Sequence, residues 1–478
     1  MKKKLSVIQI NDTHSYLEPH AELFYSSDEV TVQQAGGFAR IKTLLKEYRK
    51  EQPTLILDNG DTFHGTFEAV TTKGRHMIPT VNALGIQAMT FHWDIGYGPE
   101  NLKALGEELD YPILAINAYR KDTNDLYFDP YTILQAAGLS IGVIGIAATI
   151  IDKTMPPHFS EGLYFTMGNE ELPRYIKELK NDKKVDLIIV LSHLGFPQDV
   201  KMMQEIEGVD LCLSGHTHNR LAEPVQVGNT TIIQSGSQGS FIGKVDLTLE
   251  DNKVTSLAHS LIRVTEDIQE DSQVKKLVEQ AVGPYKEELS RQVGKTSGLL
   301  HRGWALESTM DNFLLEAIQH QTKSDLVFSN GWRYGAPIET GTITLKQLHQ
   351  IIPVNPPLST VEMSGREVLE MLEENLEHTY ASDPYQQMGG YVKRSLGLKV
   401  FFKVENPKGH RIQTLLINEK PVELERIYLV SYVTNQGVPK KYGKDHQHLD
   451  MHAVDALQKL LDDKGTYHPQ LYGTYEVI

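Results

Sequence analysis

Acidic and histidine residues that directly follow short apolar runs constrain this chain more than any other feature. In the first 220 positions, six such residues lie at or just after the ends of apolar segments: Asp12, His14, Asp61, His193, His216 and His218. Such clustering at strand ends is unusual for turn residues, which serve mainly to reverse the chain. The pattern predicts a sheet whose edge gathers these side chains.

The apolar runs are short and rich in β-branched residues, which favours buried strands over helices. The expected strands are Leu5–Ile10, Thr54–Asp58, Leu139–Ile146, Asp186–Ser192, Val209–Ser214 and Thr231–Ser235. Between them, Gly37–Lys50 and Leu172–Asn181 have helical spacing with charged faces. The alternation of strands and helices predicts an α/β domain with a largely buried sheet.

The chain of 478 residues is too long for one ordinary core, so we expect two domains. The composition becomes charged from Thr265, with apolar residues at helical spacing, which indicates a solvated joining helix. We therefore expect a first domain over residues 1–264, a linker helix over 265–294 and a second domain over 295–478. Further elements are expected in that second domain at Asn312–Gln321, Gly365–His378, Ile427–Thr434 and Asp455–Asp463.

Charge and cysteine content limit the partners and the compartment. The net charge of −15 argues against a nucleic-acid or membrane-surface binder, since both need a basic face. The single cysteine, Cys212, allows no disulfide within the chain, which suits a reducing compartment. The run Leu5–Ile10 is interrupted by polar residues and is too short for a secretory leader. We expect a cytoplasmic protein without a membrane span; the sequence does not define its oligomeric state.

The six strand-end residues form a mixed oxygen and nitrogen donor set suited to metals. In extended backbone, Asp12 and His14 would point to the same side of the strand end. Asp61 can bridge two ions, and Gly60 would let the backbone come close to them. Gly215 would permit the tight turn before His216. Imidazoles suit Mn, Fe, Zn or Ni, and carboxylates add a preference for Mn. We expect two divalent ions, with manganese preferred, that support hydrolysis.

Four sequence blocks resemble the signature of calcineurin-like metallophosphoesterases, and in particular the 5′-nucleotidase branch. The blocks are Ile10–His14, Asp58–Asp61, Ser192–His193 and Ser214–His218. The resemblance extends to the end of the chain. It implies a four-layer α/β/β/α metallophosphatase domain followed by a smaller α+β substrate-binding domain. It also implies that Asp12, His14 and His218 hold one metal, that His193 and His216 hold the other, and that Asp61 bridges them.

A further family block departs from the pattern. The family reads G-N-H-E-F-D-Y-G, whereas this chain reads Phe91-His92-Trp93-Asp94-Ile95-Gly96-Tyr97-Gly98. His92 takes the place of the ligand asparagine, and Trp93 that of the catalytic histidine. Asp94 takes the place of that histidine's acidic partner. We expect His92 to bind metal, and we assign His92 and Asp94 to catalysis; Trp93 is a donor only and cannot transfer a proton.

A rival alignment puts His92 in the catalytic position and Phe91 in the ligand position, at the cost of one inserted residue before Tyr97. His64, three residues after Asp61, is near enough in sequence to reach the site but is expected to be a loop-surface residue.

The second domain carries blocks that point to an anion. Ser329–Gly335 is similar to the nucleotidase N-G-G-x-R block, which implies substrate binding by Asn330 and Arg333. Asp383–Gly390 and the following Lys393-Arg394 pair are similar to the thiosulfohydrolase of sulfur oxidation, as is the His92-Trp93 pair. We expect Tyr391 and Arg394 to join the substrate contacts.

Three functions follow from these patterns. The main prediction is a two-metal phosphoesterase of the 5′-nucleotidase family that uses a metal-bound hydroxide on a nucleotide or a related small anionic substrate. The first alternative is hydrolysis of a sulfate ester or S-sulfonate. The second alternative is a non-catalytic protein that binds metal and nucleotide.

Overall fold

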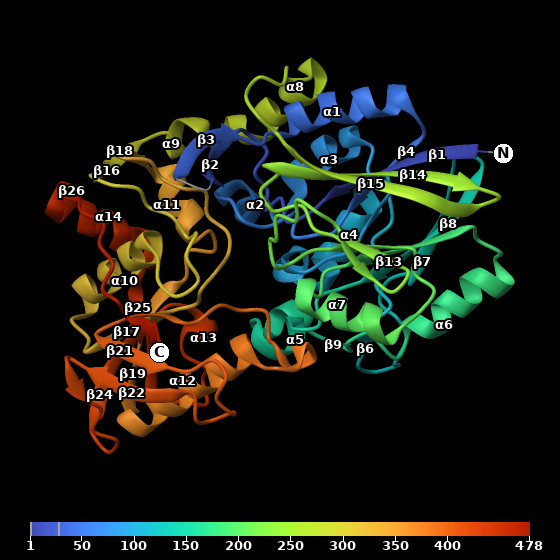
Figure 1. Cartoon of the computed structure of the whole chain (residues 1–478). Helices are drawn as coiled ribbons and strands as arrows, with labels where there is room; N and C mark the ends of the chain where they lie inside the picture. The colour runs from blue at the N-terminus through green and yellow to red at the C-terminus, as the bar shows by residue number, and fades with distance from the viewer. Residues whose placement is uncertain (1, 27–28) are drawn as a thin grey trace. The chain divides into compact units, whose positions relative to one another are not determined.

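The computed structural model describes residues 2–26 and 29–478, which form two compact units (Figure 1). Met1–His20 and Gln34–Pro284 make the first unit, and Ala21–Gln33 and Tyr285–Ile478 make the second. The strands β2 (His20–Tyr25) and β3 (Val30–Ala35) pair with each other, and most of this ribbon belongs to the second unit. This early segment of the second unit was not predicted from the sequence. The boundaries expected at residues 264 and 294 stay predictions.

Two sheets form the centre of the first unit. The first sheet has five strands in the order β15 (Lys253–Arg263), β14 (Phe241–Glu250), β1 (Lys2–Ile10), β4 (Thr54–Asp58) and β5 (Ala88–Met89). The second has six, in the order β12 (Val225–Val227), β13 (Thr230–Ile233), β11 (Leu211–Ser214), β10 (Leu187–Ser192), β8 (Leu139–Ile146) and β7 (Tyr131–Ala136). A small ribbon pairs β6 (Ala118–Arg120) with β9 (Leu163–Phe165).

One apolar cluster joins the two sheets face to face. It contains Leu5 and Val7 of β1, Leu55 of β4, and Ile141 and Val143 of β8, all at most 1% exposed. Figure 1 shows α1, α3 and α8 over the first sheet and α6 and α7 over the second. The predicted four-layer α/β/β/α arrangement is therefore confirmed.

The helices of the first unit are mostly short. They are α1 (Phe38–Glu51), α2 (Phe67–Thr72), α3 (Ile78–Leu84), α4 (Pro99–Glu108), α5 (Ile151–Thr154), α6 (Leu172–Lys177), α7 (Phe196–Glu205) and α8 (Ser272–Val282). α8 lies where the sequence indicated a linker helix. It begins with Asp271 as N-cap, and it buries Val274, Val278 and Val282. Its buried face packs against α1 and α3 of the first unit.

The pairing of strands brings the predicted donor residues to one edge. β1, β4 and β5 run parallel, with Ile10 opposite Asp58 and Asp58 opposite Met89. β10 and β11 also run parallel, with Ser192 opposite Ser214. Because carboxyl ends of parallel strands meet at the same edge, the loops after these strands lie side by side.

The second unit is an α+β domain, as predicted. Its largest sheet has the order β20 (Arg394–Leu396), β17 (Leu326–Ser329), β24 (Ile427–Tyr432), β19 (Pro357–Ser364) and β25 (Lys444–His452). Two smaller sheets contain β18 (Gly341–Thr344), β16 (Gln292–Thr296) and β26 (Thr466–Tyr467), and β23 (Lys420–Pro421), β22 (Ile412–Ile417), β21 (Leu398–Phe402) and β27 (Tyr475–Val477).

The helices of this unit are α9 (Lys286–Leu289), α10 (Thr309–Thr322), α11 (Leu345–Ile351), α12 (Gly365–Tyr380), α13 (Thr434–Gly437) and α14 (Ala453–Lys464). α12 begins with a capping box in which Ser364 and Glu367 satisfy each other's backbone amides. Across the described residues of both units, every helix is too short or too polar to cross a membrane.

Candidate metal centre

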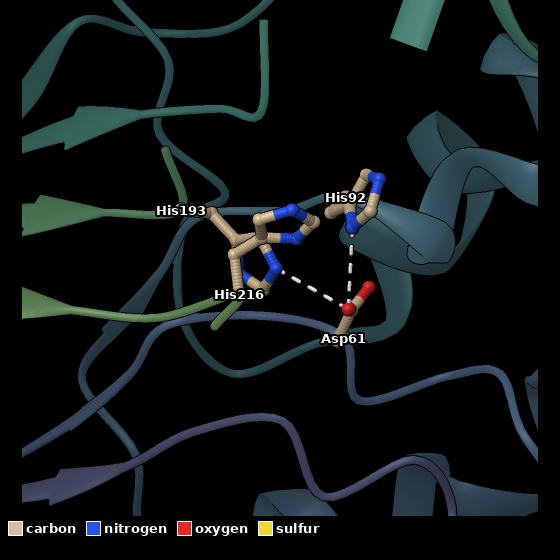
Figure 2. A group of neighbouring side chains, drawn as sticks. All are labelled: Asp61, His92, His193 and His216. Atoms are coloured by element: carbon tan, nitrogen blue, oxygen red, sulfur yellow. Dashed lines mark hydrogen bonds and ion pairs between the residues drawn. The ribbon is translucent and has the colours of Figure 1, made fainter. Parts of the chain in front are cut away.

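Two groups of acid and histidine side chains share one carboxylate at the strand edge. The first donor group contains Asp12, His14, Asp61 and His218, and the second contains Asp61, His92, His193 and His216. In each group the donor atoms lie within 4.8 Å of one another. Figure 2 shows the second donor group, whose side chains come from the loops after β4, β5, β10 and β11. The structure thus brings together all seven residues that the sequence nominated as metal ligands.

Asp61 lies at the junction of the two donor groups. Its Oδ2 atom is 3.2 Å from Nδ1 of His92 and 3.2 Å from Nε2 of His193. The same oxygen is 3.9 Å from Nε2 of His14, in the first donor group. Its Oδ1 atom accepts the backbone N–H of Trp93 at 2.6 Å, which fixes the carboxylate plane. This geometry suits a carboxylate that bridges two ions.

Distances in the first donor group suit one small cation. Nε2 of His218 is 3.2 Å from Oδ1 of Asp12 and 3.1 Å from Nε2 of His14. Two imidazole nitrogens that are each about 2.1 Å from one ion lie about 3 to 3.4 Å apart. The donor set of carboxylates and imidazoles also suits a divalent transition ion. The residues therefore fit a metal on chemical and geometric grounds.

Five of the seven residues have a left-handed backbone conformation, which non-glycine residues seldom adopt. The φ angles are 51° for Asp12, 48° for His14, 54° for Asp61, 72° for His216 and 56° for His218. The expectation of an extended Asp12–His14 segment is therefore wrong, because β1 ends at Ile10 and a tight turn follows. Backbone strain of this kind is concentrated at functional sites, where the surrounding structure maintains it.

The glycines next to the site leave room for neighbouring protein atoms. A Cβ atom on Gly60, whose φ is +88°, would lie 2.5 Å from the carbonyl oxygen of Thr90. A Cβ atom on Gly215 would lie 3.0 Å from Nδ1 of His193. These contacts add a second reason for each glycine: Gly60 allows the loops after β4 and β5 to touch, and Gly215 allows the His193 ring to fit. The tight turn expected at Gly215 is present, since the N–H of Thr217 donates to the Gly215 carbonyl oxygen at 2.9 Å.

Asn59 orients His193, a role that the sequence analysis missed. The Nδ1 atom of His193 lies 2.6 Å from the carbonyl oxygen of Asn59, which directs Nε2 toward the carboxylates. The Asn59 side chain donates to the carbonyl oxygens of Ser192 and Leu213, and it accepts from the side chain of Gln9. One buried amide thus joins the ends of β1, β4, β10 and β11.

The electrostatics of the site keep its carboxylates ionised. Burial acts to raise the pKa of Asp61, but His92 and His193 hold it well below its usual range. Burial acts to lower the pKa of His193, but Asp61 and Asp12 raise it to about 10. His14 lies in the other donor group, and burial lowers its pKa to about 4. Ionised carboxylates among buried imidazoles form an environment that a divalent cation complements.

The loop after β5, which departs from the family block, places His92 in the second donor group and Phe91 in the apolar core. Phe91 is fully buried and packs edge-on against Phe128 and Phe165. This arrangement supports the alignment in which His92 takes the ligand position. His64 is 1% exposed and stacks on Trp93 with ring centroids 4.6 Å apart, so the expectation of a surface histidine is wrong.

Asp94 is saturated by backbone amides. Its Oδ1 atom accepts from the N–H groups of Thr62 and Phe63, both at 2.8 Å. Its Oδ2 atom accepts from the N–H groups of Asp61 at 2.8 Å and His92 at 3.1 Å. The carboxylate therefore holds the loops after β4 and β5 together, and both oxygens are occupied by this task.

In the second unit, the two arginines expected to bind substrate have different surroundings. Arg333 is half-buried, donates to the carbonyl oxygen of Gly389 at 3.0 Å, and lies 4.4 Å from the ring centre of Tyr391. Arg394 is 1% exposed and donates to Asp311 at 2.9 Å and to the carbonyl oxygens of Trp304 and Ala305. Arg333 therefore keeps some exposure to solvent, whereas Arg394 is committed to internal contacts.

Asp311 also binds Arg302, which the sequence analysis did not single out. The Nε atom of Arg302 is 2.8 Å from Asp311, so two guanidinium groups share one buried carboxylate. The sequence carries no local signal for this network, since Asp311 and Arg394 are 83 positions apart.

Comparisons with known proteins agree with this architecture. The family model of calcineurin-like phosphoesterases matches residues 5–220, and the model of the 5′-nucleotidase C-terminal domain matches residues 289–438. This chain belongs to the 5′-nucleotidase family of calcineurin-like metallophosphoesterases. Members of this family use a dinuclear divalent-metal site, and the Asp and His cluster described above fits one.

Among curated relatives, the chain is 26% identical to 5′-nucleotidase of Rattus norvegicus over 491 residues, which cover 91% of this chain and 83% of the relative. It is 23% identical over 457 residues to the trifunctional nucleotide phosphoesterase YfkN of Bacillus subtilis. That match covers 85% of this chain and only 30% of the relative's own length.

Two solved structures share the fold. The sulfate thiohydrolase SoxB of Thermus thermophilus, solved with glycerol, superposes with a TM-score of 0.91 at 22% identity, covering 99% of this chain and 96% of SoxB. A 5′-nucleotidase precursor from Thermus thermophilus superposes with a TM-score of 0.88 at 22% identity, covering 99% of both chains.

Proposed function

We propose that this 5′-nucleotidase family member hydrolyses a phosphate ester of a nucleotide or a related small molecule with two divalent ions, preferably manganese. The observation that carries the proposal is the membership of Asp61 in both donor groups, with its Oδ2 atom facing donors of each. Asp12, His14 and His218 would hold one ion with Asp61. His92, His193 and His216 would hold the other.

Two ions held in this way would polarise the ester and make a bound water a better nucleophile. Other groups of the protein orient the metal-binding side chains. The backbone N–H of Trp93 fixes the plane of Asp61, and Asn59 fixes the ring of His193. We propose a positioning role for Asp94 in place of the catalytic role expected from the sequence, because its oxygens are taken by four amides.

The second unit would bind the anionic part of the substrate. Arg333 supports this role because the residue is half-buried and its guanidinium lies over the ring of Tyr391. Asn330, also half-buried, belongs to the same loop after β17. For Arg394 we propose a structural role through Asp311. A cytoplasmic location and the domain limits at residues 264 and 294 remain part of the proposal.

Hydrolysis of an S-sulfonate is the second candidate. The side chain of Trp93 favours it, since an indole replaces the proton-transferring histidine of the family block beside His92. The Asp383–Gly390 block of the sequence also favours it. A non-catalytic metal and nucleotide binder is the third candidate.

The experiment is a substrate screen with manganese-loaded protein. Nucleotides, an aryl phosphate and an S-sulfonated thiol are compared, with Asp61→Ala as the inactive control. Release of phosphate from the esters supports the proposal. Release of sulfate alone selects the second candidate, and nucleotide binding without release of either selects the third.

A further inference from the structure

Trp93, in the loop after β5, packs with His64 and Phe159 beside the second donor group, and these three side chains form an aromatic wall. The Trp93 ring lies edge-on to His92, with centroids 5.9 Å apart, and edge-on to Phe159 at 5.5 Å. On its flat side it stacks on His64, nearly parallel at 13°. Trp93 is only 9% exposed, so packing on three sides fixes its position.

The side chains that form this wall are poorly suited to give a proton to a departing group. Trp93 carries only an indole N–H, which is a hydrogen-bond donor and not an acid. His64 is 1% exposed, and its Nδ1 atom is 3.2 Å from the hydroxyl of Tyr97. Burial lowers the pKa of His64 to about 3, so the ring is neutral near pH 7. Asp94 is occupied by four backbone amides.

Where the described residues of this wall supply no proton, the chemistry of the leaving group decides the rate. General acid catalysis contributes about 10²- to 10⁴-fold in rate. A nucleoside 5′-monophosphate must expel an alkoxide, which is about as basic as hydroxide. A phosphoanhydride expels a phosphate group, whose relevant pKa is about 6. The second kind of leaving group needs no proton from the protein.

We propose that this enzyme is selective for phosphoanhydrides and similarly activated phosphate esters over alkyl phosphates such as nucleoside monophosphates. The inference rests on the proposed two-metal phosphoesterase function. In the step, a water oxygen forms a bond to phosphorus, and the bond from phosphorus to the leaving oxygen breaks. The electron pair stays on the leaving oxygen, and the protons of the water pass to solvent. His64 acts as a positioning residue that holds Trp93 in the wall.

The test compares three substrates with manganese-loaded wild type, Trp93→His and Trp93→Phe. The substrates are p-nitrophenyl phosphate, a nucleoside diphosphate and the corresponding nucleoside monophosphate. For wild type and Trp93→Phe, we expect kcat/KM to be at least about 100-fold lower for the monophosphate than for the other two substrates, since neither protein carries an acid at position 93. In Trp93→His we expect this gap to narrow about tenfold or more.

Equal kcat/KM values of wild type for all three substrates overturn the inference while leaving the two-metal function intact. If none of the three substrates releases phosphate, p-nitrophenyl phosphate included, the proposed function is refuted, and the inference with it. If Trp93→His does not fold, the rates of wild type across a series of aryl phosphates decide the matter. The inference requires a steep decrease as the phenol becomes less acidic, and a flat series contradicts it.

Discussion

Replacement of Asp94 by asparagine tests the positioning role of this carboxylate. An asparagine side chain has one oxygen and one NH2 group, so two of the four backbone N–H groups would face a donor instead of an acceptor. These N–H groups are buried with Asp94, which is fully buried. Each buried donor left without an acceptor costs about 1 to 3 kcal/mol, so the free energy of unfolding should decrease by about 2 to 6 kcal/mol.

The assay is urea unfolding of the metal-free protein, combined with hydrogen exchange of the peptide that contains Thr62 and Phe63. We expect a lower urea midpoint for Asp94→Asn and faster exchange in this peptide. The matched control is Asp122→Asn on the exposed surface, which should change stability by no more than about 0.5 kcal/mol. An Asp94→Asn protein with the midpoint and exchange rates of the wild type refutes the positioning role.

Three further predictions concern the arginines, His64 and the metals. Arg394→Met should destabilise the chain by about 1.5 to 3 kcal/mol, because Asp311 loses one charged hydrogen bond but keeps its ion pair with Arg302. Arg333→Met should raise KM and should lower the melting temperature less than Arg394→Met does; equal melting temperatures and equal KM values for the two variants would contradict the assignment. His64 has an ordinary pKa of 6.5 in the unfolded chain, and burial lowers its pKa to about 3 in the folded chain. Below pH 6.5 the unfolded chain therefore binds a proton that the folded chain does not, and the free energy of unfolding decreases as the pH falls. His64→Phe should therefore reduce the decrease in the urea midpoint of metal-free protein between pH 6.5 and about pH 5, and the exposed control His158→Phe should not. Manganese at about 100 times its dissociation constant should stabilise the chain by about 2.7 kcal/mol per site, and a chelator should reverse the shift; a melting temperature that does not respond to manganese would argue against metal binding.

Most strands that precede the donor residues could be predicted from sequence because they are largely buried, whereas the two-residue strand β5 before His92 was not predicted. β4 and β8 have the predicted bounds, since a continuous apolar run between polar turns leaves little choice of limits. β15 was not predicted, because its exposed face carries Ser256, Ala258 and Ser260, and its pairing with β14 decides its structure.

The seven residues of the two donor groups could also be predicted from sequence. The backbone conformations that bring them together could not. Five left-handed backbone conformations replace the expected extended strand end, and sequence rules seldom assign φ > 0 to aspartate or histidine. Arg333 and Arg394 are alike in sequence. Only the folded chain, which brings Asp311 to Arg394, distinguishes the buried, ion-paired arginine from the half-buried one.

Manganese binding tests the central claim of two metals on one shared carboxylate most directly. Metal analysis of wild-type protein equilibrated with manganese, together with low-temperature electron paramagnetic resonance, reports the number of ions and their magnetic coupling. We expect two ions per chain with a coupled spectrum, because Asp61 belongs to both donor groups and bridged ions lie about 3.5 to 4 Å apart. We also expect Asp61→Ala to lose this coupling. One ion per chain, or two ions with uncoupled spectra in the wild type, would contradict the account.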